Sequence, residues 1–416
     1  MQQKVREWES RRQWIVCQLG ARENYMVARA LASSGQLAAL VTDVWQAPDS
    51  LAGRLNGRLK DRYHPQLAGE YVEAPRYAYF ARELGARYLG AAGWRRIMAR
   101  NAWFEAMAAR RLRSIVTRRG PCDTVFAYSY AAGAIFRAAK SLGMSTVLGQ
   151  IDPGPMEDEI VADLYRQAGQ SARYERIPSD YWSRWRDEIA LADIIVANSE
   201  WSKSALIQSG VPRDRIRVVP LAYDAPAQAS SGARLLPQRF TPERPLRLLF
   251  LGQVTLRKGI GPLLEAMQRM PTAAIRLDIV GEVQAEIPEP IAADSRIAFH
   301  GATQRSAVHR YYEEADLFVF PTFSDGFGIT QLESLAHGLP VLTSRHCGAV
   351  VEHDVNGFVL DDVTPEAIEA ALLAVIADPS RIGAWSRNAR VPIANRPDAL
   401  VRHLSQLSAV QTRRPL

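Results

Sequence analysis

The chain has 416 residues, too many for one ordinary hydrophobic core, so we expect two domains. With 47% apolar and 23% charged residues, its composition is that of a soluble globular protein, and no apolar run approaches the roughly 18–20 residues of a membrane span. The three cysteines, Cys17, Cys122 and Cys347, lack C-x-x-C spacing, which argues against a disulfide framework or a zinc site and favours a reducing cytoplasm.

The formal net charge is +7, and the excess is concentrated between Arg76 and Arg119, where eleven arginines accompany only two acids, Glu83 and Glu105. Aromatic residues are interleaved with these arginines. Such a stretch predicts peripheral contact with an anionic membrane surface. The alternative is a set of helices with solvated arginine faces. Because no nucleic-acid-binding module is recognisable, we expect no nucleic-acid partner.

In the first half of the chain, short runs of β-branched and apolar residues alternate with longer segments of helical period, which is typical of α/β proteins. The predicted strands are 14–19, 37–44, 124–129, 145–152, 194–198 and 215–220. The predicted helices are one that carries Tyr25 to Leu31 and stops before Gly35, then 131–143 and 200–210, the last with Ser199 as its N-cap.

A stretch without periodicity, rich in Ala, Ser, Pro and Gln, predicts an interdomain linker at 223–245 between an N-terminal domain of residues 1–222 and a C-terminal domain of residues 246–385. The C-terminal strands are expected at 246–252, 274–281, 296–301, 316–322, 340–344 and 356–360, and its helices at 259–270, 307–315, 329–338 and 364–378. Residues 386–416 form a helical segment that we expect to pack back on the N-terminal domain.

Parallel strands joined by crossover helices in both halves predict an α/β fold of two doubly wound, Rossmann-like domains. Ligands of such sheets bind beyond the carboxyl ends of the strands, and here two such edges can face one cleft.

The most informative segment runs from Pro321 to Pro340, where a buried strand ends in a loop that contains Gly326 and Gly328. A helix follows, and its first-turn N–H groups attract anions and hydroxyl oxygens. Asp325 in the loop and Glu333 in the helix are eight residues apart and approach one pocket from different angles. This arrangement suits binding the hydroxyls of a sugar and a ribose. The alternative is a capping Asp and a solvated Glu.

A second segment, Gly252 to Ile260, places Arg257 and Lys258 side by side where a helix begins. Cations at a helix start oppose the macrodipole, so they are poorly placed for stability alone. A bound diphosphate would resolve this conflict.

These segments resemble those of the retaining GT-B glycosyltransferases of family 4, the group 1 glycosyl transferases. The resemblance is specific over 185–380 and weak over 14–45, and several matching stretches carry it. They are Gly252, Lys258-Gly259, Val280-Gly281, Gly301, Tyr311-Tyr312 with Ala315-Asp316, Pro321, Gly326-Phe327-Gly328, Glu333, Ala336 with Gly338, Pro340-Val341, Asn356-Gly357, Ala192 to Glu200, and Val218 to Asp224.

The resemblance implies a role for each matching position. Lys258 would hold the diphosphate of a UDP- or GDP-sugar, and Glu333 would bind the ribose. Asp325 would orient the sugar with the backbone of Phe327, Gly328 and Ile329. The remaining donor contacts would come from Gly252, Gln253, Gly301, Thr303, Gly326, Thr330 and, across the cleft, the Gly20-Ala21 turn. Since no Asp-x-Asp occurs, we expect no cofactor and no metal, with cations as the charge stabiliser.

Three departures from the family pattern bear on the chemistry. Gln253 replaces the Arg that follows the first glycine, and we predict that Arg257 reaches the same phosphate. Asp325 replaces a Glu. The family's histidine at an N-terminal strand end is absent, and Tyr128 to Tyr130 and Gln150 to Asp152 occupy the comparable strand ends.

The sequence thus predicts a retaining, metal-independent glycosyltransferase that acts on a polysaccharide, an oligosaccharide or a lipid-linked acceptor in the cytoplasm or at the inner face of the membrane. The main alternative is a weakened or inactive relative that binds a nucleotide sugar as a partner subunit. An epimerase on the same fold is disfavoured by the loop before Glu333, and a membrane-surface adaptor built on Arg76–Arg119 is a further alternative.

Overall fold

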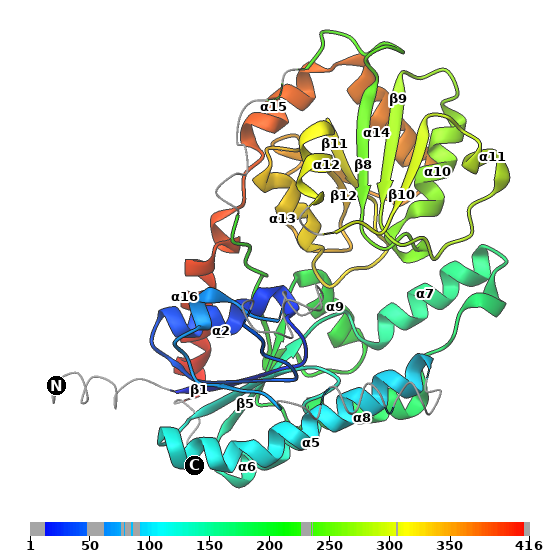
Figure 1. Cartoon of the computed structure of the whole chain (residues 1–416). Coiled ribbons are helices and arrows are strands. Elements are labelled where there is room, and N and C mark those ends of the chain that lie inside the picture. Colours follow the sequence, from blue (N-terminus) through cyan, green and yellow to red (C-terminus); the bar gives the residue numbers. More distant parts are fainter. Residues whose placement is uncertain are drawn as a thin grey trace.

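The computed structural model of the chain describes residues 13–47, 62–75, 79, 85, 92–225, 234, 236–304 and 307–411. Within these ranges the chain forms two parallel sheets, each flanked by helices and each belonging to one domain (Figure 1). The predicted α/β fold with two doubly wound domains is confirmed.

The N-terminal sheet has the strand order β3-β2-β1-β4-β5-β6-β7. Its strands are β1 (Trp14–Gln18), β2 (Leu37–Thr42), β3 (Val72–Glu73), β4 (Thr124–Tyr128), β5 (Ser145–Gln150), β6 (Ile194–Ala197) and β7 (Ile216–Val218). Every residue of β1 and β2 is buried, because helices cover both faces of a doubly wound sheet.

The helices of this domain are α2 (Met26–Ser33), α5 (Gly93–Arg119), α6 (Gly133–Ser141), α7 (Pro155–Gln167), α8 (Ser179–Leu191) and α9 (Glu200–Gln208). Short 3₁₀ turns lie at η1 (Arg22–Tyr25), η3 (Pro65–Leu67), η4 (Ser171–Arg173) and η5 (Arg213–Arg215). As predicted, Ser199 caps α9, since its side chain accepts a hydrogen bond from the Ser202 N–H at 3.0 Å.

The C-terminal sheet has the order β10-β9-β8-β11-β12-β13. Its strands are β8 (Leu246–Leu251), β9 (Ile275–Val280), β10 (Ile297–Gly301), β11 (Leu317–Phe320), β12 (Val341–Ser344) and β13 (Gly357–Leu360). The turns and helices around it are η6 (Leu256–Lys258), α10 (Ile260–Arg269), α11 (Glu289–Ala292), α12 (His309–Glu314), α13 (Ile329–Ala336), α14 (Pro365–Ala377) and α15 (Ser380–Asn388).

Strand order places the two chemically informative segments side by side. In the C-terminal sheet the connections run in opposite directions from the neighbouring strands β8 and β11, which makes this pair the switch point. The segment with Arg257 and Lys258 follows β8, and the segment with Asp325 follows β11. Parallel pairing of the two strands therefore brings both segments to one edge of the sheet.

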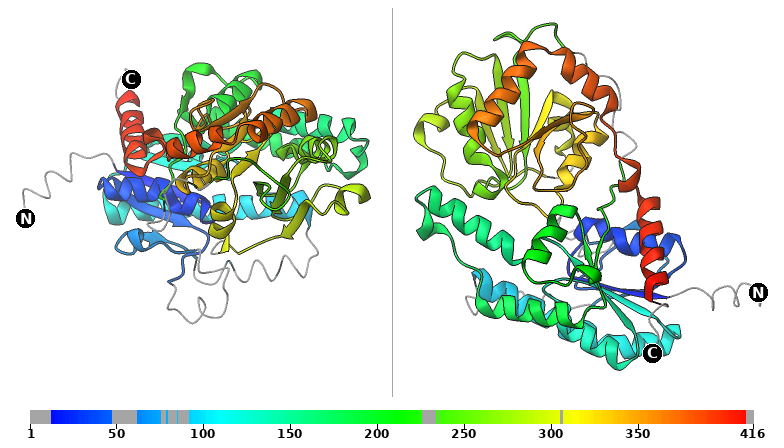
Figure 2. Two further views of the ribbon diagram at one scale, coloured as in Figure 1. Left: turned by 90° about the horizontal axis from the view of Figure 1, so that it is seen from above. Right: turned by 180° about the vertical axis from the view of Figure 1, so that it is seen from behind.

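Past α15, the chain passes through η8 (Ile393–Asn395) and returns to the N-terminal domain as α16 (Pro397–Gln411), which lies beside α2 (Figures 1 and 2). Three α16 residues, Leu400, Leu404 and Leu407, are buried in the same cluster as residues of α2. The two chain segments that connect the domains are hydrogen-bonded to each other. The Tyr223 N–H donates to the Asn395 carbonyl, and the Asn395 side chain donates to the Leu221 carbonyl, both at 2.8 Å.

The arginine-rich stretch contains the long helix α5, which begins only at Gly93, and most of residues 76–91 lie outside the described residues. Residues Phe104, Ala108, Leu112 and Ile115 of α5 are buried at helical spacing, while Arg95, Arg110 and Arg113 are exposed. The helix therefore has an apolar face on the core and an arginine face on the surface. Of the helices that the structure describes, none combines the length and apolarity needed to cross a bilayer.

Sequence periodicity did not identify β3, α7 or α8. Strand β3 has only two residues, too few to show alternation. In α8, aromatic side chains serve as core residues, and Trp185 is buried with its indole N–H donating to the Gln150 side chain at 3.0 Å. Trp185 thus has a packing role in the core.

Asp316, at the end of α12, offers a test of how the C-terminal domain is held together. It is 3% exposed, and its two carboxylate oxygens each accept a hydrogen bond from Arg244 at 2.7 Å. We expect Asp316→Ala to lower the free energy of unfolding by about 3 kcal/mol, because it leaves the guanidinium without its buried partner. Chemical denaturation of this variant and of Glu314→Ala, an exposed neighbour, would check this; equal losses would contradict it.

Candidate functional site

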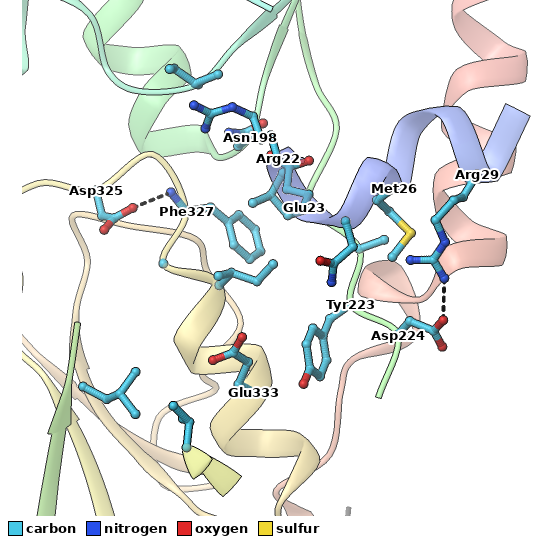
Figure 3. Close-up of a pocket in the computed structure, with 18 of the residues that line it drawn as sticks. Arg22, Glu23, Met26, Arg29, Asn198, Tyr223, Asp224, Asp325, Phe327 and Glu333 are labelled. Carbon is cyan, nitrogen blue, oxygen red and sulfur yellow. Dashed lines mark hydrogen bonds and ion pairs between the residues drawn. The ribbon is translucent and has the colours of Figure 1, made fainter. Parts of the chain in front are cut away.

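A cleft of about 1090 Å³ lies between the two domains, and Asp325 and Glu333 are among the residues that line it (Figure 3). The C-terminal domain contributes Leu251, Thr303, Val308, His309, Tyr312, Asp325, Phe327, Gly328, Ile329, Glu333 and His337. The N-terminal domain and the segment that leaves it contribute Leu19, Arg22, Glu23, Asn24, Met26, Arg29, His64, Ile151, Asn198, Leu221, Ala222, Tyr223 and Asp224.

Glycine makes the close approach of the two loops possible. Gly259, which follows η6, has a φ of +76°, and a Cβ on it would lie only 1.8 Å from the Pro321 carbonyl oxygen. Gly328, at the start of α13, has a φ of +78°, and a Cβ on it would lie 2.6 Å from the ring of Phe320. A side chain at Gly259 would therefore push the loops after β8 and β11 apart, and one at Gly328 would displace the Phe320 ring.

Asp325 and Lys258 join these two loops by an ion pair between the Lys258 Nζ and Asp325 Oδ2. The other carboxylate oxygen of Asp325 accepts from the Phe327 N–H at 3.0 Å (Figure 3), and the Lys258 ammonium lies 4.7 Å from the centre of the Phe320 ring. Burial alone would raise the pKa of Asp325, but the charges of Lys258 and Arg257 outweigh it and hold this pKa below its ordinary value. Asp325 is thus an anion at neutral pH.

Arg257 points to the domain boundary. Its Nη1 donates to the Ser324 carbonyl at 2.7 Å and lies 3.4 Å from Glu157 Oε2 and 3.9 Å from Asp325 Oδ2. The two cations at the start of α10 are therefore compensated by Asp325 and Glu157, which offsets the unfavourable helix dipole without a ligand. Gln253, the departure from the family pattern, is exposed.

Glu333 lies one turn into α13 and faces the cleft opposite Tyr223 (Figure 3). Its Oε2 accepts a hydrogen bond from the Tyr312 hydroxyl at 2.9 Å. The Tyr312 ring stacks on His337, with ring centres 5.1 Å apart. The Nδ1 atom of His337 forms a hydrogen bond with the Glu333 carbonyl. His337 therefore has a packing role, and the Glu333 carboxylate is held in place at the cleft wall.

The loop of Asp325 also contacts the N-terminal domain directly. The Gly326 carbonyl accepts from the hydroxyls of Ser199 at 2.8 Å and Ser202 at 3.1 Å. A Cβ on Gly326 would lie 2.4 Å from the Ile151 carbonyl oxygen. Gly326 is thus required for the close contact of the two domains, a role that the sequence did not predict.

On the N-terminal wall, the turn after β1 has an unusual backbone. Glu23, Asn24 and Tyr25 follow one another at φ values of 51°, 50° and 59°, a region that costs each such residue about 1–3 kcal/mol. The Gly20 N–H donates to Asp43 at 2.9 Å, which anchors the beginning of this turn. Burial raises the pKa of Glu23, although Arg22 and the Tyr128 hydroxyl oppose that effect.

The predicted site residues fall into two groups. Those that line the cleft are Thr303, Asp325, Phe327, Gly328, Ile329 and Glu333. Those outside its lining are Gly20, Ala21, Gly252, Gln253, Arg257, Lys258, Gly301, Gly326 and Thr330. Lys258 and Arg257 nevertheless contact Asp325, so they border the cleft through it.

Several lining residues were not identified as site residues from the sequence. Asn198 had a signal, since it ends the predicted strand 194–198 at the carboxyl edge. Arg29 and His64 had none, because a charged side chain in a helix and a histidine outside any motif are common. In the structure Arg29 is buried and pairs with Asp224 at 2.5 Å, as Figure 3 shows.

Among the side chains that the structure describes, no group of three or more His, Cys, Asp or Glu residues is arranged to hold a metal ion. Cys347 is buried near the loop, and burial raises the pKa of its thiol to about 12, which keeps it protonated at neutral pH.

Comparison with known protein families gives two matches that together span the greater part of the chain. The model described as "Glycosyl transferases group 1" matches residues 245–378, and the model described as "Glycosyltransferase Family 4" matches residues 61–225. The first match contains the loops after β8 and β11.

Among curated proteins, the D-inositol 3-phosphate glycosyltransferase of Xylanimonas cellulosilytica is 28% identical over 222 residues, which cover 49% of this chain and 53% of that protein. The chain thus spans about half the length of the curated relatives it matches.

Among solved structures, HepE of Anabaena in complex with UDP superposes with a TM-score of 0.61 at 15% identity, over 96% of this chain and 100% of that one. The sucrose-phosphate synthase of Thermosynechococcus elongatus gives a TM-score of 0.62 at 17% identity, over 96% and 99%. At such identities these likenesses show the fold.

The ion pair of Lys258 and Asp325 predicts a pH-dependent loss of stability in Lys258→Met. A carboxylate whose pKa is depressed in the folded state stabilises above its unfolded pKa, and this contribution disappears as the pH falls through the folded pKa. Without Lys258, burial raises the pKa of Asp325, so the variant should lose more stability at about pH 7 than at about pH 4.

Thermal unfolding at the two pH values would measure this difference. In an Asp325→Asn background the Lys258→Met change should show no such pH dependence. An equal loss at both pH values in the otherwise unchanged chain would contradict the assignment of the pair.

Proposed function

We propose, since this chain belongs to the family 4 glycosyltransferases (glycosyl transferases group 1), that it transfers a sugar from a nucleotide-diphosphate donor to a glycan or lipid-linked acceptor. The observation that carries the proposal is the Lys258–Asp325 ion pair at the switch point of the C-terminal sheet, beside the interdomain cleft that Asp325 and Glu333 both line. Cations, an anion and a helix start in one place suit a ligand with a diphosphate, a ribose and a sugar.

Lys258 and Arg257 would hold the diphosphate and stabilise the charge that develops on it as the bond to the sugar breaks. Lys258 is paired with Asp325, and its three N–H donors allow it to contact a phosphate oxygen at the same time. The N-terminal amides of α13, which begins at Ile329, would add donors without a net charge. We propose that these groups replace a divalent metal.

Asp325 and Glu333 would bind the two polyhydroxyl parts of the donor. Both line the cleft, Asp325 from the loop before α13 and Glu333 from about one turn into this helix. Asp325 would orient the sugar together with the backbone of Phe327, Gly328 and Ile329, and Glu333 would bind the ribose. The base would lie near Gly301 and Thr303, of which Thr303 lines the cleft.

We further propose that the transfer retains the anomeric configuration. Asp325 is held by Lys258 and by the Phe327 N–H, an arrangement that suits binding better than nucleophilic attack. The leaving phosphate would then accept the proton of the incoming hydroxyl on the same face of the sugar.

We propose a UDP- or GDP-sugar as the donor. The neighbour HepE was crystallised with UDP, and a curated relative of Escherichia coli is named O-antigen chain mannosyltransferase B. These names support a nucleotide-sugar donor in general. The alternative, a weakened or inactive partner subunit that binds a nucleotide sugar, rests on Gln253, which is exposed and carries no charge, and on the absence of the family's histidine at an N-terminal strand end.

The acceptor would be presented at a membrane surface by the arginine face of α5, with the protein in the cytoplasm at the inner face of the bilayer. Exposed arginines near an anionic surface each contribute about 1 kcal/mol to binding. We do not expect nucleic acid to be the partner of this face.

Release of nucleotide from a panel of UDP-, GDP- and ADP-sugars, with EDTA present, tests the proposed reaction. We expect release from one donor in the unmodified chain and a loss of about a hundredfold or more in Lys258→Ala and in Glu333→Ala, because each removes a charged contact to the donor. Lys140→Ala, remote from the cleft, is the control for loss of a lysine.

Near-normal rates in both variants would contradict the assignment of Lys258 and Glu333 to the donor site. Nucleotide-sugar binding without turnover would favour the inactive partner subunit. The anomeric signal of the product in NMR spectra decides the stereochemistry, and inversion would contradict the retaining mechanism.

Membrane contact through α5 predicts sensitivity to charge reversal. The variant Arg95→Glu/Arg110→Glu/Arg113→Glu should bind vesicles of phosphatidylglycerol and phosphatidylcholine at least about tenfold more weakly, because three cations become anions. Co-sedimentation would measure this, with Arg387→Glu/Arg390→Glu/Arg402→Glu as the control, since these arginines are also exposed. Equal binding by both triple variants would rule out the α5 surface.

A further inference from the structure

Glu157 connects the two domains at the edge of the cleft. It lies in the first turn of α7 in the N-terminal domain, with 18% of its side chain exposed. Its Oε2 accepts a hydrogen bond from the Ser324 hydroxyl at 2.8 Å and lies 3.4 Å from Arg257 Nη1. Both partners belong to the C-terminal domain, one in each of the two loops that form the candidate diphosphate site.

The contact restrains one side of the Arg257 guanidinium. Nη1 is held by the Ser324 carbonyl and by Glu157. The structure gives Nε and Nη2 of Arg257 no hydrogen-bond partner among the described residues. A guanidinium held through one nitrogen still offers its other N–H groups in a fixed plane, which is the geometry that binds phosphate oxygens in pairs.

Ser324 is itself held from both domains. Its hydroxyl accepts from the Trp201 indole N–H at 3.2 Å, and its carbonyl accepts from the Thr322 hydroxyl at 2.9 Å. The orientation of Arg257 therefore depends on side chains of the N-terminal domain, although Arg257 follows a strand of the C-terminal one.

We propose that Glu157 is a positioning residue, which orients Arg257 for the donor diphosphate and thereby makes the complete phosphate site depend on contact between the two domains. This inference rests on the proposed function of the cleft. In this inference Arg257 supplies the positive charge that the uncharged Gln253 lacks. Glu157 on α7 determines the orientation of Arg257.

The charge of Glu157 should respond to pH near neutrality. Burial raises its pKa to about 7, against the opposing charge of Arg257 and with the support of the nearby carboxylates Asp152 and Asp325. Tyr174, after η4, also faces Glu157. Helix α9 packs against α7, and its charged residues Glu200 and Lys203 form an ion pair with each other. Above this pKa the carboxylate attracts Arg257, and below it the attraction is lost.

Binding of UDP-glucose and GDP-mannose, measured by calorimetry at about pH 6 and about pH 8, tests the inference. The diphosphate of a nucleotide sugar is esterified at both ends and keeps its charge over this range. Glu157→Gln preserves the shape and the contact to Ser324 but removes the charge. Glu159→Gln, an exposed acid two residues along the same helix, is the matched control.

We expect the unmodified chain and Glu159→Gln to bind the donor more tightly at about pH 8 than at about pH 6. Glu157→Gln should lose this difference and bind about tenfold more weakly at the higher pH, as expected for loss of one charge-assisted contact. In an Arg257→Ala background, Glu157→Gln should change donor affinity by less than about twofold, because the two residues act as a unit.

Equal pH dependence in Glu157→Gln and Glu159→Gln, tighter donor binding in Glu157→Gln, or an undiminished effect in the Arg257→Ala background would each overturn the inference while leaving the proposed function intact. If the unmodified chain bound neither nucleotide sugar, the proposed donor class would be wrong, and the inference with it.

Discussion

The ion pair of Lys258 and Asp325 is the interaction on which the candidate site depends. It joins the loops after β8 and β11, which adjacent parallel strands deliver to one edge of the sheet. A buried carboxylate of this kind is tolerated only with a charged partner close by, and a lysine at the start of a helix needs an anion. Each group thus offsets part of the energetic cost of the other, at the edge of a cleft that can admit a diphosphate.

Most of the architecture could be predicted from the sequence because doubly wound domains repeat one simple pattern. Strands such as 194–198 and 316–322 are short apolar runs, and the helices after them begin with a cap or a glycine. The exceptions have different physical causes. Helix α8 buries Trp185, Glu188 and Ile189, a mixed set that shows no aliphatic stripe in the sequence, and β3 is too short to show a period.

The candidate site could be predicted only in its C-terminal half. Asp325 and Glu333 lie in one continuous segment, where a glycine loop before a helix is visible in the sequence. Glu157 could not be found in this way. Its partner Arg257 is one hundred residues away, and only the packing of α7 on η6 brings them together. The left-handed turn at Glu23 to Tyr25 was equally hidden, because none of its three residues is a glycine.

The position of α16 has a consequence for the order in which the domains can be completed during synthesis. Leu400, Leu404 and Leu407 belong to the same buried cluster as residues of β1 and α2, which precede them by most of the described chain. During synthesis these apolar residues of β1 and α2 stay without the cover of α16 until residue 407 has been made, whereas the β8–α14 unit already has every strand of its sheet. The nascent chain therefore exposes apolar surface of the N-terminal domain during that interval, and this surface is prone to aggregation.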